Sequence, residues 1–264
     1  METWVRLERH GPVGRIVLAR GAAGNAINLE MAERLGDVAE ACAEDPAIRA
    51  VTVEAEGQAF CVGGDLAAFS AQRGAARRQL LRRMAERVHA AQLRLLTMPK
   101  PVIVAAHGAV AGAGLGLALA GDIVLASATA HFTAAYTRVG LSADGGSTYL
   151  LPRLVGLRRT QELLLTNRRL SAAEALEWGL VTAVVAPPAL AAAAAAKAHA
   201  MANGPTAAHG AIKRLLATSL QTDFAHQTAL ESRHISRLSV TADAAEGFAA
   251  FFEKRPPIFT GVDA

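Results

Sequence analysis

The sequence has little cysteine, little charge and no recognisable leader segment. Its 2 cysteines, Cys42 and Cys61, form no CxxC pair, which excludes a disulfide framework and favours a reducing compartment such as the cytoplasm. The first residues, METWVRLERHG, contain no apolar segment, so we expect no secretory signal peptide. Charged residues make up 19% of the 264 residues and apolar residues 52%, which excludes a disordered or fibrous chain.

Several motifs that would indicate a function are also missing. The chain has no GxxxxGKS/T phosphate loop, no GxSxG nucleophile elbow and no HExxH metal motif, and its GAGLG segment does not complete GxGxxG. A dinucleotide-binding domain is therefore not expected. The formal net charge of +4 suits an anionic ligand but is too small to indicate nucleic acid binding.

One uncharged segment, 101–121, approaches the length of a membrane span. It contains His107 and five glycines, which divide it into a strand at Val102–Ala106, a turn and a short helix at Leu115–Ala120. We therefore interpret this segment as part of the core, and we expect no membrane contact.

The predicted elements begin with a hairpin. Its strands are expected at Val5–Arg9 and Arg15–Ala19, followed by a helix at Leu29–Glu44 that ends before Asp45-Pro46. The short β-branched segment Ala50–Glu54 predicts a buried strand.

A repeated plan follows this strand. Strand 50–54 leads through FCVGGDL into a helix, and strand 102–106 leads through HGAVAGAG into another. A third strand is expected at Ile123–Ala126, then a loop, VGLSADGGSTY, and helices at Leu157–Leu165 and Ala172–Trp178. Strand, glycine turn and helix in this order predict an α/β protein with crossover connections.

The last part of the chain is expected to be helical. The segment 189–202 is almost entirely alanine, the residue with the highest helix propensity. Asn203-Gly204-Pro205 forms the clearest boundary, and the pattern beyond it is helical throughout. We therefore predict a core at 1–202 and a helical oligomerisation module at 203–264.

Two glycine turns are candidates for binding. FCVGG and AGAGLG each bring unobstructed backbone N–H groups to a helix N-terminus, where an anion or a polarised carbonyl oxygen binds well. Each turn alone is equally compatible with a tight strand-to-helix connection. Their equivalent places in successive units favour convergence on one oxygen.

Several polar side chains elsewhere in the chain allow two interpretations each. Asp144 in LSADGG occupies either an exposed turn or a dry pocket among apolar neighbours, where burial would raise its pKa toward that of a general base. His89 is either a packed or surface residue of a helix or a site residue. Six arginines recur at helical spacing and form either a solvated face or a site for phosphates or a polyanion: Arg73, Arg77, Arg78, Arg82, Arg83 and Arg87.

Five segments, in this order, carry a resemblance to a known family: FCVGGDL, PKPVIVAAHGAVAGAGLGLALAGD, VGLSADGGSTYLLPRLVG, SAAEALEWGLV and EGFAAFFEKRPPIFTG. The chain resembles the crotonase (enoyl-CoA hydratase/isomerase) superfamily over nearly its whole length. The resemblance implies an α/β fold, a spiral of repeated ββα units with a C-terminal helical trimerisation module, and a homotrimer or hexamer. It also implies an acyl-CoA thioester ligand and no metal or redox cofactor apart from the coenzyme A of the substrate.

The family holds the thioester oxygen between two backbone N–H groups, which fall on Gly64 and Ala113 of this chain. Its hydratases use two glutamates, and their positions carry Gly116 and Tyr136 here. The carboxylate that remains in the matched loops is Asp144. The hydratase mechanism therefore lacks both of its catalytic groups.

An aspartate in this loop resembles two subgroups. In enoyl-CoA isomerases it moves a proton between carbons, and in 4-chlorobenzoyl-CoA dehalogenases it attacks an aryl carbon with help from a histidine that aligns with His89. The dehalogenase tryptophan corresponds to Tyr136 and its bulky aromatic residue to Gly64, so the aromatic box is incomplete. We therefore expect a double-bond isomerase in which Asp144 is the acid–base and Tyr136 shapes the pocket or donates a hydrogen bond.

The resemblance also suggests a coenzyme A site. Loop 25–28 is expected near the adenine, and Lys254 and Phe259 near the ligand of a neighbouring subunit. The candidate binding residues are Asn25, Ala26, Ile27, Gly63, Asp65, Leu66, Lys254 and Phe259. Three alternatives stay open: a hydrolytic or dehalogenating enzyme with Asp144 as nucleophile, a hydratase despite the missing glutamates, and a non-catalytic relative that binds RNA or coenzyme A.

Overall fold

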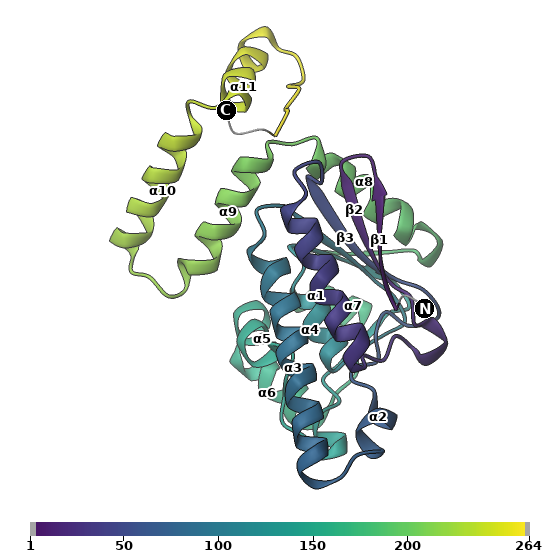
Figure 1. Cartoon of the computed structure of the whole chain (residues 1–264). Helices are drawn as coiled ribbons and strands as arrows, with labels where there is room; N and C mark the ends of the chain where they lie inside the picture. The colour runs from purple at the N-terminus through teal and green to yellow at the C-terminus, as the bar shows by residue number, and fades with distance from the viewer. Residues whose placement is uncertain (1–3, 262–264) are drawn as a thin grey trace.

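The structure, a computed structural model, describes residues 4–261 and has two sheets (Figure 1). The larger sheet has the strand order β1-β2-β3-β4-β6-β9, in which β1 and β2 are antiparallel and every later pair is parallel. Its strands are β1 (Val5–His10), β2 (Val13–Leu18), β3 (Ala50–Ala55), β4 (Val102–Ala106), β6 (Ile123–Ser127) and β9 (Ala183–Val185). The predicted hairpin, buried strands and parallel crossovers are thus confirmed.

The smaller sheet is built largely from the segments that follow β4 and β6 of the larger sheet. It consists of β5 (Ala109–Ala111), β7 (His131–Thr133) and β8 (Leu170–Ser171), in the order β5-β7-β8. Isolated bridges join Ile27 to Gly64 and Cys61 to Val110. These pairings hold both predicted glycine turns beside this sheet.

Helices cover both faces of the larger sheet. On one face pack α1 (Leu29–Glu44) and α3 (Gly74–Thr97), and on the other lies α8 (Leu190–Ala202) (Figure 1). The alanines of α8 have a packing role, because Ala194 and Ala198 are fully buried in one cluster with the strand residue Ile103. Small side chains let this helix lie close to the strands.

The remaining helices lie between the strands of the two sheets along the chain or form its C-terminal part. They are α2 (Leu66–Ser70), α4 (Ala113–Leu119), α5 (Ser147–Val155), α6 (Leu157–Thr166), α7 (Ala172–Glu177), α9 (Thr206–Ser219), α10 (Phe224–Leu238) and α11 (Ala242–Glu253), with 3₁₀ turns η1 (Gly21–Ala23), η2 (Thr137–Val139) and η3 (Pro187–Ala189).

Two expectations about elements were wrong. Helix α4 begins at Ala113, two residues before the predicted start, because Gly112 serves as its N-cap. Helix α5 begins inside a segment expected to be a loop, since Leu151 and Val155 bury one face of it despite the proline at 152. The uncharged segment 101–121 forms β4, β5 and α4. Within residues 4–261 there is no helix whose length and apolar character would allow it to cross a membrane.

The helices α9 to α11 extend away from the core (Figure 1) and are fastened to it by two cations. Lys213 on α9 donates to Asp122 at 2.6 Å and to the carbonyl oxygens of Leu95 and Lys100. Arg49 donates to the carbonyl oxygen of Phe259 at 3.1 Å. The described part of the C-terminal segment is therefore connected back to the first strands of the sheet.

Exposed apolar side chains gather on these last helices. They include Phe224, Ile235, Phe248, Phe251 and Phe252. Such surfaces are typical of protein–protein contacts. The division at residue 203 and the oligomerisation role of this module stay predictions.

Replacing Lys213 with methionine should destabilise the chain. The Lys213 side chain is only 9% exposed, burial lowers its pKa, and it balances Asp122, whose pKa burial raises. Loss of the cation leaves a partly buried carboxylate unpaired, at a cost of about 2 kcal/mol because Asp122 keeps some contact with water. Urea denaturation would measure this loss, with exposed Lys197→Met as the control. Equal stability of the two variants would contradict the role assigned to Lys213.

Candidate active site

The first glycine turn follows β3 and is held against the second. Gly63 has a φ of +105°, and a Cβ added there would lie 3.2 Å from the carbonyl oxygen of Ala111 and 3.5 Å from Cα of Gly112. A side chain at this position is therefore both strained and crowded. The close approach of Gly63 and Gly112 brings the two predicted turns side by side.

The second turn forms the start of α4. Gly112, with a φ of 53°, is the N-cap, and its N–H donates to the carbonyl oxygen of Thr133 at 3.2 Å. Ala113 is the first residue of the helix. Its N–H therefore belongs to the group of helix N-terminal donors that have no intrahelical acceptor.

Two backbone donors are unused at this place. Within residues 4–261, neither the N–H of Gly64 nor that of Ala113 has a hydrogen-bond acceptor. Both residues line the same cavity, of about 360 Å³. Free N–H groups at the start of a helix attract a negative or polarised oxygen. The arrangement can hold a carbonyl oxygen that gains charge during a reaction.

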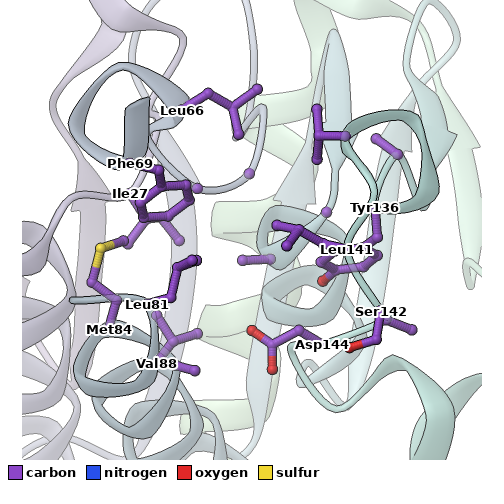
Figure 2. A pocket seen from close by; sticks show the side chains of 18 of the residues that line it. Ile27, Leu66, Phe69, Leu81, Met84, Val88, Tyr136, Leu141, Ser142 and Asp144 are labelled. Atoms are coloured by element: carbon purple, nitrogen blue, oxygen red, sulfur yellow. The ribbon is translucent and has the colours of Figure 1, made fainter. Parts of the chain in front are cut away.

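The cavity walls are mostly apolar. Helix α3 contributes one side and the segment 136–143 the other, as Figure 2 shows. The apolar side chains of the lining include Ile27, Val62, Leu66, Phe69, Leu81, Met84, Val88, Val139 and Leu141. Such a lining suits an acyl group rather than a charged ligand.

Asp144 supplies the sole carboxylate among the described residues that line this cavity. Figure 2 shows it pointing into the cavity toward the side chains of α3. Of the two interpretations of Asp144, the dry pocket is wrong, because its side chain is 39% exposed at the edge of the cavity. The ring of His89 lies beside it, with Nε2 2.7 Å from Oδ1. The carboxylate is thus paired and reachable by solvent.

The structure puts His89 and the arginines in different settings. His89 is 47% exposed and contacts the site through Asp144. The predicted arginines lie on exposed positions along α3 or at its N-cap, and Arg82, which pairs with Glu86, also lines the cavity. A solvated face accounts for most of this pattern.

Tyr136 borders the cavity on the side opposite α3. Its hydroxyl is buried close to Ser147 and the backbone of Asp144, without a partner at hydrogen-bond geometry among residues 4–261. Burial, and secondarily the negative charge of Asp144, raise the pKa of Tyr136 well above its ordinary value. The hydroxyl therefore stays protonated and available as a donor.

Gln92 is a site residue that the sequence reasoning missed. Its Nε2 donates to the carbonyl oxygen of Gly145 at 3.1 Å, and the residue is only 4% exposed. The signal was present, because Gln92 interrupts the buried apolar row formed by Val88, Ala91 and Leu95 on α3. A polar residue in such a row needs a partner.

Five of the eight candidate coenzyme A residues divide into two groups. Ile27, Gly63 and Leu66 line the cavity. Asn25 is fully buried and its amide donates to the carbonyl oxygens of residues 56 and 59, while Asp65 caps α2 and pairs with Arg20 at 2.7 Å. These last two side chains hold the loop rather than face a ligand.

Three further candidates lie outside the cavity lining. Ala26 is half-buried, and its carbonyl oxygen accepts a hydrogen bond from Arg20. Lys254 follows α11 and is exposed, and Phe259 borders a separate apolar groove between α9 and α11. The contact of Lys254 and Phe259 with a neighbouring subunit's ligand stays a prediction, as does the place of Ala26 near the adenine.

Comparison with known proteins gives one consistent result. The family described as enoyl-CoA hydratase/isomerase matches residues 8–262. A probable enoyl-CoA hydratase of Rhodobacter capsulatus is 37% identical, over 97% of this chain and 98% of that protein. A 1,2-epoxyphenylacetyl-CoA isomerase of Escherichia coli is 36% identical, over 90% of both. A trans-2-decenoyl-[acyl-carrier-protein] isomerase of Streptococcus mutans is 33% identical, over 94% of this chain and 95% of that protein.

Solved structures agree with this result. A putative enoyl-CoA hydratase/isomerase from Mycobacterium abscessus superposes with a TM-score of 0.91 at 36% identity, covering 98% of this chain and 100% of that one. A putative enoyl-CoA hydratase from Streptomyces coelicolor also gives 0.91, at 35% identity, covering 98% and 94%. Since the match extends over nearly the whole chain in sequence and in fold, this protein is an acyl-CoA enzyme that belongs to the enoyl-CoA hydratase/isomerase family of the crotonase superfamily.

Proposed function

We propose that this enzyme moves the double bond of an enoyl-CoA thioester by two-step proton transfer, with Asp144 as the acid–base. The observation that carries the proposal is the placement of one cavity-lining carboxylate beside two unused backbone N–H groups. A 3-enoyl-CoA is the substrate class that this arrangement suits.

In this mechanism the thioester oxygen binds between the N–H groups of Gly64 and Ala113. Asp144 removes a proton from the carbon next to the thioester carbonyl, and the electron pair moves onto the oxygen to give a dienolate. The two donors stabilise that developing charge. The protonated Asp144 then returns the proton to the carbon two positions away, so the double bond ends next to the carbonyl. No cofactor other than the coenzyme A of the substrate is part of this scheme.

Hydration receives less support from the site. The two positions of the family's glutamates carry Gly116 and Tyr136. A Cβ at position 116 would lie 1.9 Å from the carbonyl oxygen of Gly145, so the backbone leaves no room for a side chain there. The Tyr136 hydroxyl stays protonated, so it cannot replace the glutamate as the base that activates water.

Some relatives are named hydratases and others isomerases. The Rhodobacter relative is called a probable hydratase, whereas the Escherichia and Streptococcus relatives are called isomerases. The side chains at the site, rather than these names, support isomerisation. The homotrimer or hexamer and the cytoplasmic location expected from the sequence remain part of this proposal.

The test is incubation with separate 3-enoyl-, 2-enoyl- and benzoyl-CoA thioesters, followed by liquid chromatography and mass spectrometry, because chromatography separates an isomeric product from unreacted substrate of the same mass. Isomerisation leaves the mass of the thioester unchanged, whereas hydration adds one water. Conversion of the 3-enoyl thioester without a change in mass supports the proposal, and accumulation of a hydrated product contradicts it.

One observation favours a second candidate function. The 2.7 Å contact between His89 and Asp144 resembles the pair that a hydrolytic or dehalogenating enzyme would use, with Asp144 as nucleophile and His89 as helper. In the dehalogenating reaction Asp144 attacks the aryl carbon, the halide leaves and an aryl ester forms on Asp144. In the hydrolytic reaction Asp144 attacks the thioester carbonyl, the coenzyme A thiolate leaves and an acyl adduct forms. Water then cleaves either adduct. Intact-mass measurement during a single turnover would detect the adduct.

The variant His89→Gln separates the two candidates. Because the contact between His89 and Asp144 is partly exposed and glutamine keeps a donor, isomerisation should fall by less than about tenfold. A hydrolytic or dehalogenating enzyme would instead accumulate the covalent adduct on Asp144, since its water-activating group is lost. Steady-state rates together with intact mass decide between these outcomes.

A further inference from the structure

The loop that carries Asp144 is held from α3 by two side chains. His89 and Gln92 lie three residues apart and therefore on the same face of this helix. His89 contacts the Asp144 carboxylate at 2.7 Å, and the Gln92 amide donates to the carbonyl oxygen of the next residue, Gly145, at 3.1 Å. One helix thus fixes both the side chain and the following peptide.

The amide of Gln92 is buried at a cost. The residue is 4% exposed among apolar neighbours of α3. A buried amide is unfavourable unless it is hydrogen-bonded, and the bond from Gln92 Nε2 goes to the Asp144 loop rather than to α3 itself. An apolar residue at position 92 would stabilise the packing of α3 more than glutamine does. The Gln92 amide is therefore better explained by its hydrogen bond to the Asp144 loop.

Helix α4 confines the same carbonyl from another side. A Cβ on Gly116 would lie 1.9 Å from the carbonyl oxygen of Gly145 and 2.8 Å from Nε2 of Gln92. The Gln92 amide, the Gly116 backbone and the Gly145 carbonyl therefore meet at one point. The loop can occupy this place only because residue 116 has no side chain.

Gly145 also borders the reacting groups. A Cβ added to it would lie 3.2 Å from Oη of Tyr136 and 3.3 Å from Cα of Ala113. Its φ of +59° and that of Gly146, +69°, form the left-handed turn that follows Asp144. A shift of Gly145 would therefore move Asp144 relative to the N–H of Ala113.

We infer that Gln92 is a positioning residue, which with Gly116 clamps the Gly145 carbonyl and so sets the position of the Asp144 carboxylate against the substrate. The inference rests on the proposed function, in which Asp144 moves the proton. A misplacement of about 1 Å can cost about 10²-fold in rate, even when the displaced group is intact. The clamp therefore contributes to turnover without touching substrate.

The variant Gln92→Met keeps the length of the side chain and removes the donor. We expect kcat for 3-enoyl-CoA isomerisation to fall by about 10-fold to 10²-fold, because the loop is no longer fixed. Affinity for a saturated acyl-CoA, measured by calorimetry, should stay at the parent value. Gln79→Met is the matched control, since Gln79 is an exposed residue of the same helix, and its kcat should equal that of the parent.

A double-variant cycle distinguishes positioning from general destabilisation. If Gln92 acts through Asp144, Gln92→Met should cause no further loss in an Asp144→Asn background, measured at high enzyme concentration. A merely structural role would lower the residual rate by the same factor in both backgrounds. Gln92→Leu, which also removes the donor and has a smaller side chain, should reproduce the loss if Gln92→Met does not fold.

The outcomes separate this inference from the proposed function. Parent-like turnover of folded Gln92→Met, or an equal loss in the Asp144→Asn background, overturns the positioning role while Asp144 keeps its assignment. Parent-like turnover of Asp144→Asn itself overturns the proposed function, and the inference with it.

Discussion

Replacing Asp144 with asparagine is expected to lower kcat for 3-enoyl-CoA isomerisation by about 10²–10⁴-fold, the usual contribution of a general base. The amide has the shape of the carboxylate but can neither take nor return the proton. The side chain lines the cavity beside Tyr136 and Ala113, and no second carboxylate among the described lining residues can replace it. Steady-state kinetics measure the loss.

Binding should survive this substitution. The thioester oxygen is held by backbone N–H groups, so affinity for a saturated acyl-CoA should equal that of the parent. Solvent deuterium exchange at the carbon beside the thioester should fall in parallel with kcat. Asp37→Asn, at an exposed position of α1, is the control. Unchanged exchange in Asp144→Asn would show that the base lies elsewhere.

Replacing Ala113 with proline should lower kcat by about 10²–10³-fold, equivalent to about 2.7–4 kcal/mol in the transition state, the typical effect of losing one oxyanion donor. The variant removes one N–H that faces the cavity and has no other acceptor among residues 4–261. Ala113 is the first residue of α4, the helical position at which proline is best tolerated. The fold should therefore persist.

A second variant at the same position isolates the role of the N–H. Ala113→Gly keeps the donor and changes the side chain alone, so its rate should stay near that of the parent. The melting temperature of Ala113→Pro reports whether the turn at Gly112 has been disturbed. A folded Ala113→Pro enzyme that turns over at the parent rate would show that the Ala113 N–H does not stabilise the thioester oxygen.

Local sequence patterns predicted much of the core. The β-branched strand at 50–54, the strand at 102–106 and the glycine turns after them are short-range features, and each has the expected structure. The two turns also lie together, because parallel strands deliver the segments that follow them to the same edge of a sheet. Asp144 was found because its loop sits between apolar segments.

The misses have long-range causes. The exposure of Asp144 was missed, because it depends on how α3, which carries His89 55 residues away, lies along the site. Gln92 acts through a peptide 53 residues away, so nothing in its neighbours along the chain shows the partner. Helix α5 was missed because the glycines before it and Pro152 within it suggest a loop, whereas burial of Leu151 favours the helix.

The most direct test of Asp144 as the acid–base of an isomerase follows a 3-enoyl-CoA by proton NMR with the parent enzyme and Asp144→Asn side by side. If Asp144 is the acid–base of an isomerase, the parent produces the conjugated 2-enoyl thioester without a hydroxyacyl product, and Asp144→Asn leaves the substrate almost unchanged on the same time scale. A hydroxyacyl product from the parent, or the conjugated product formed equally fast by Asp144→Asn, would contradict this assignment.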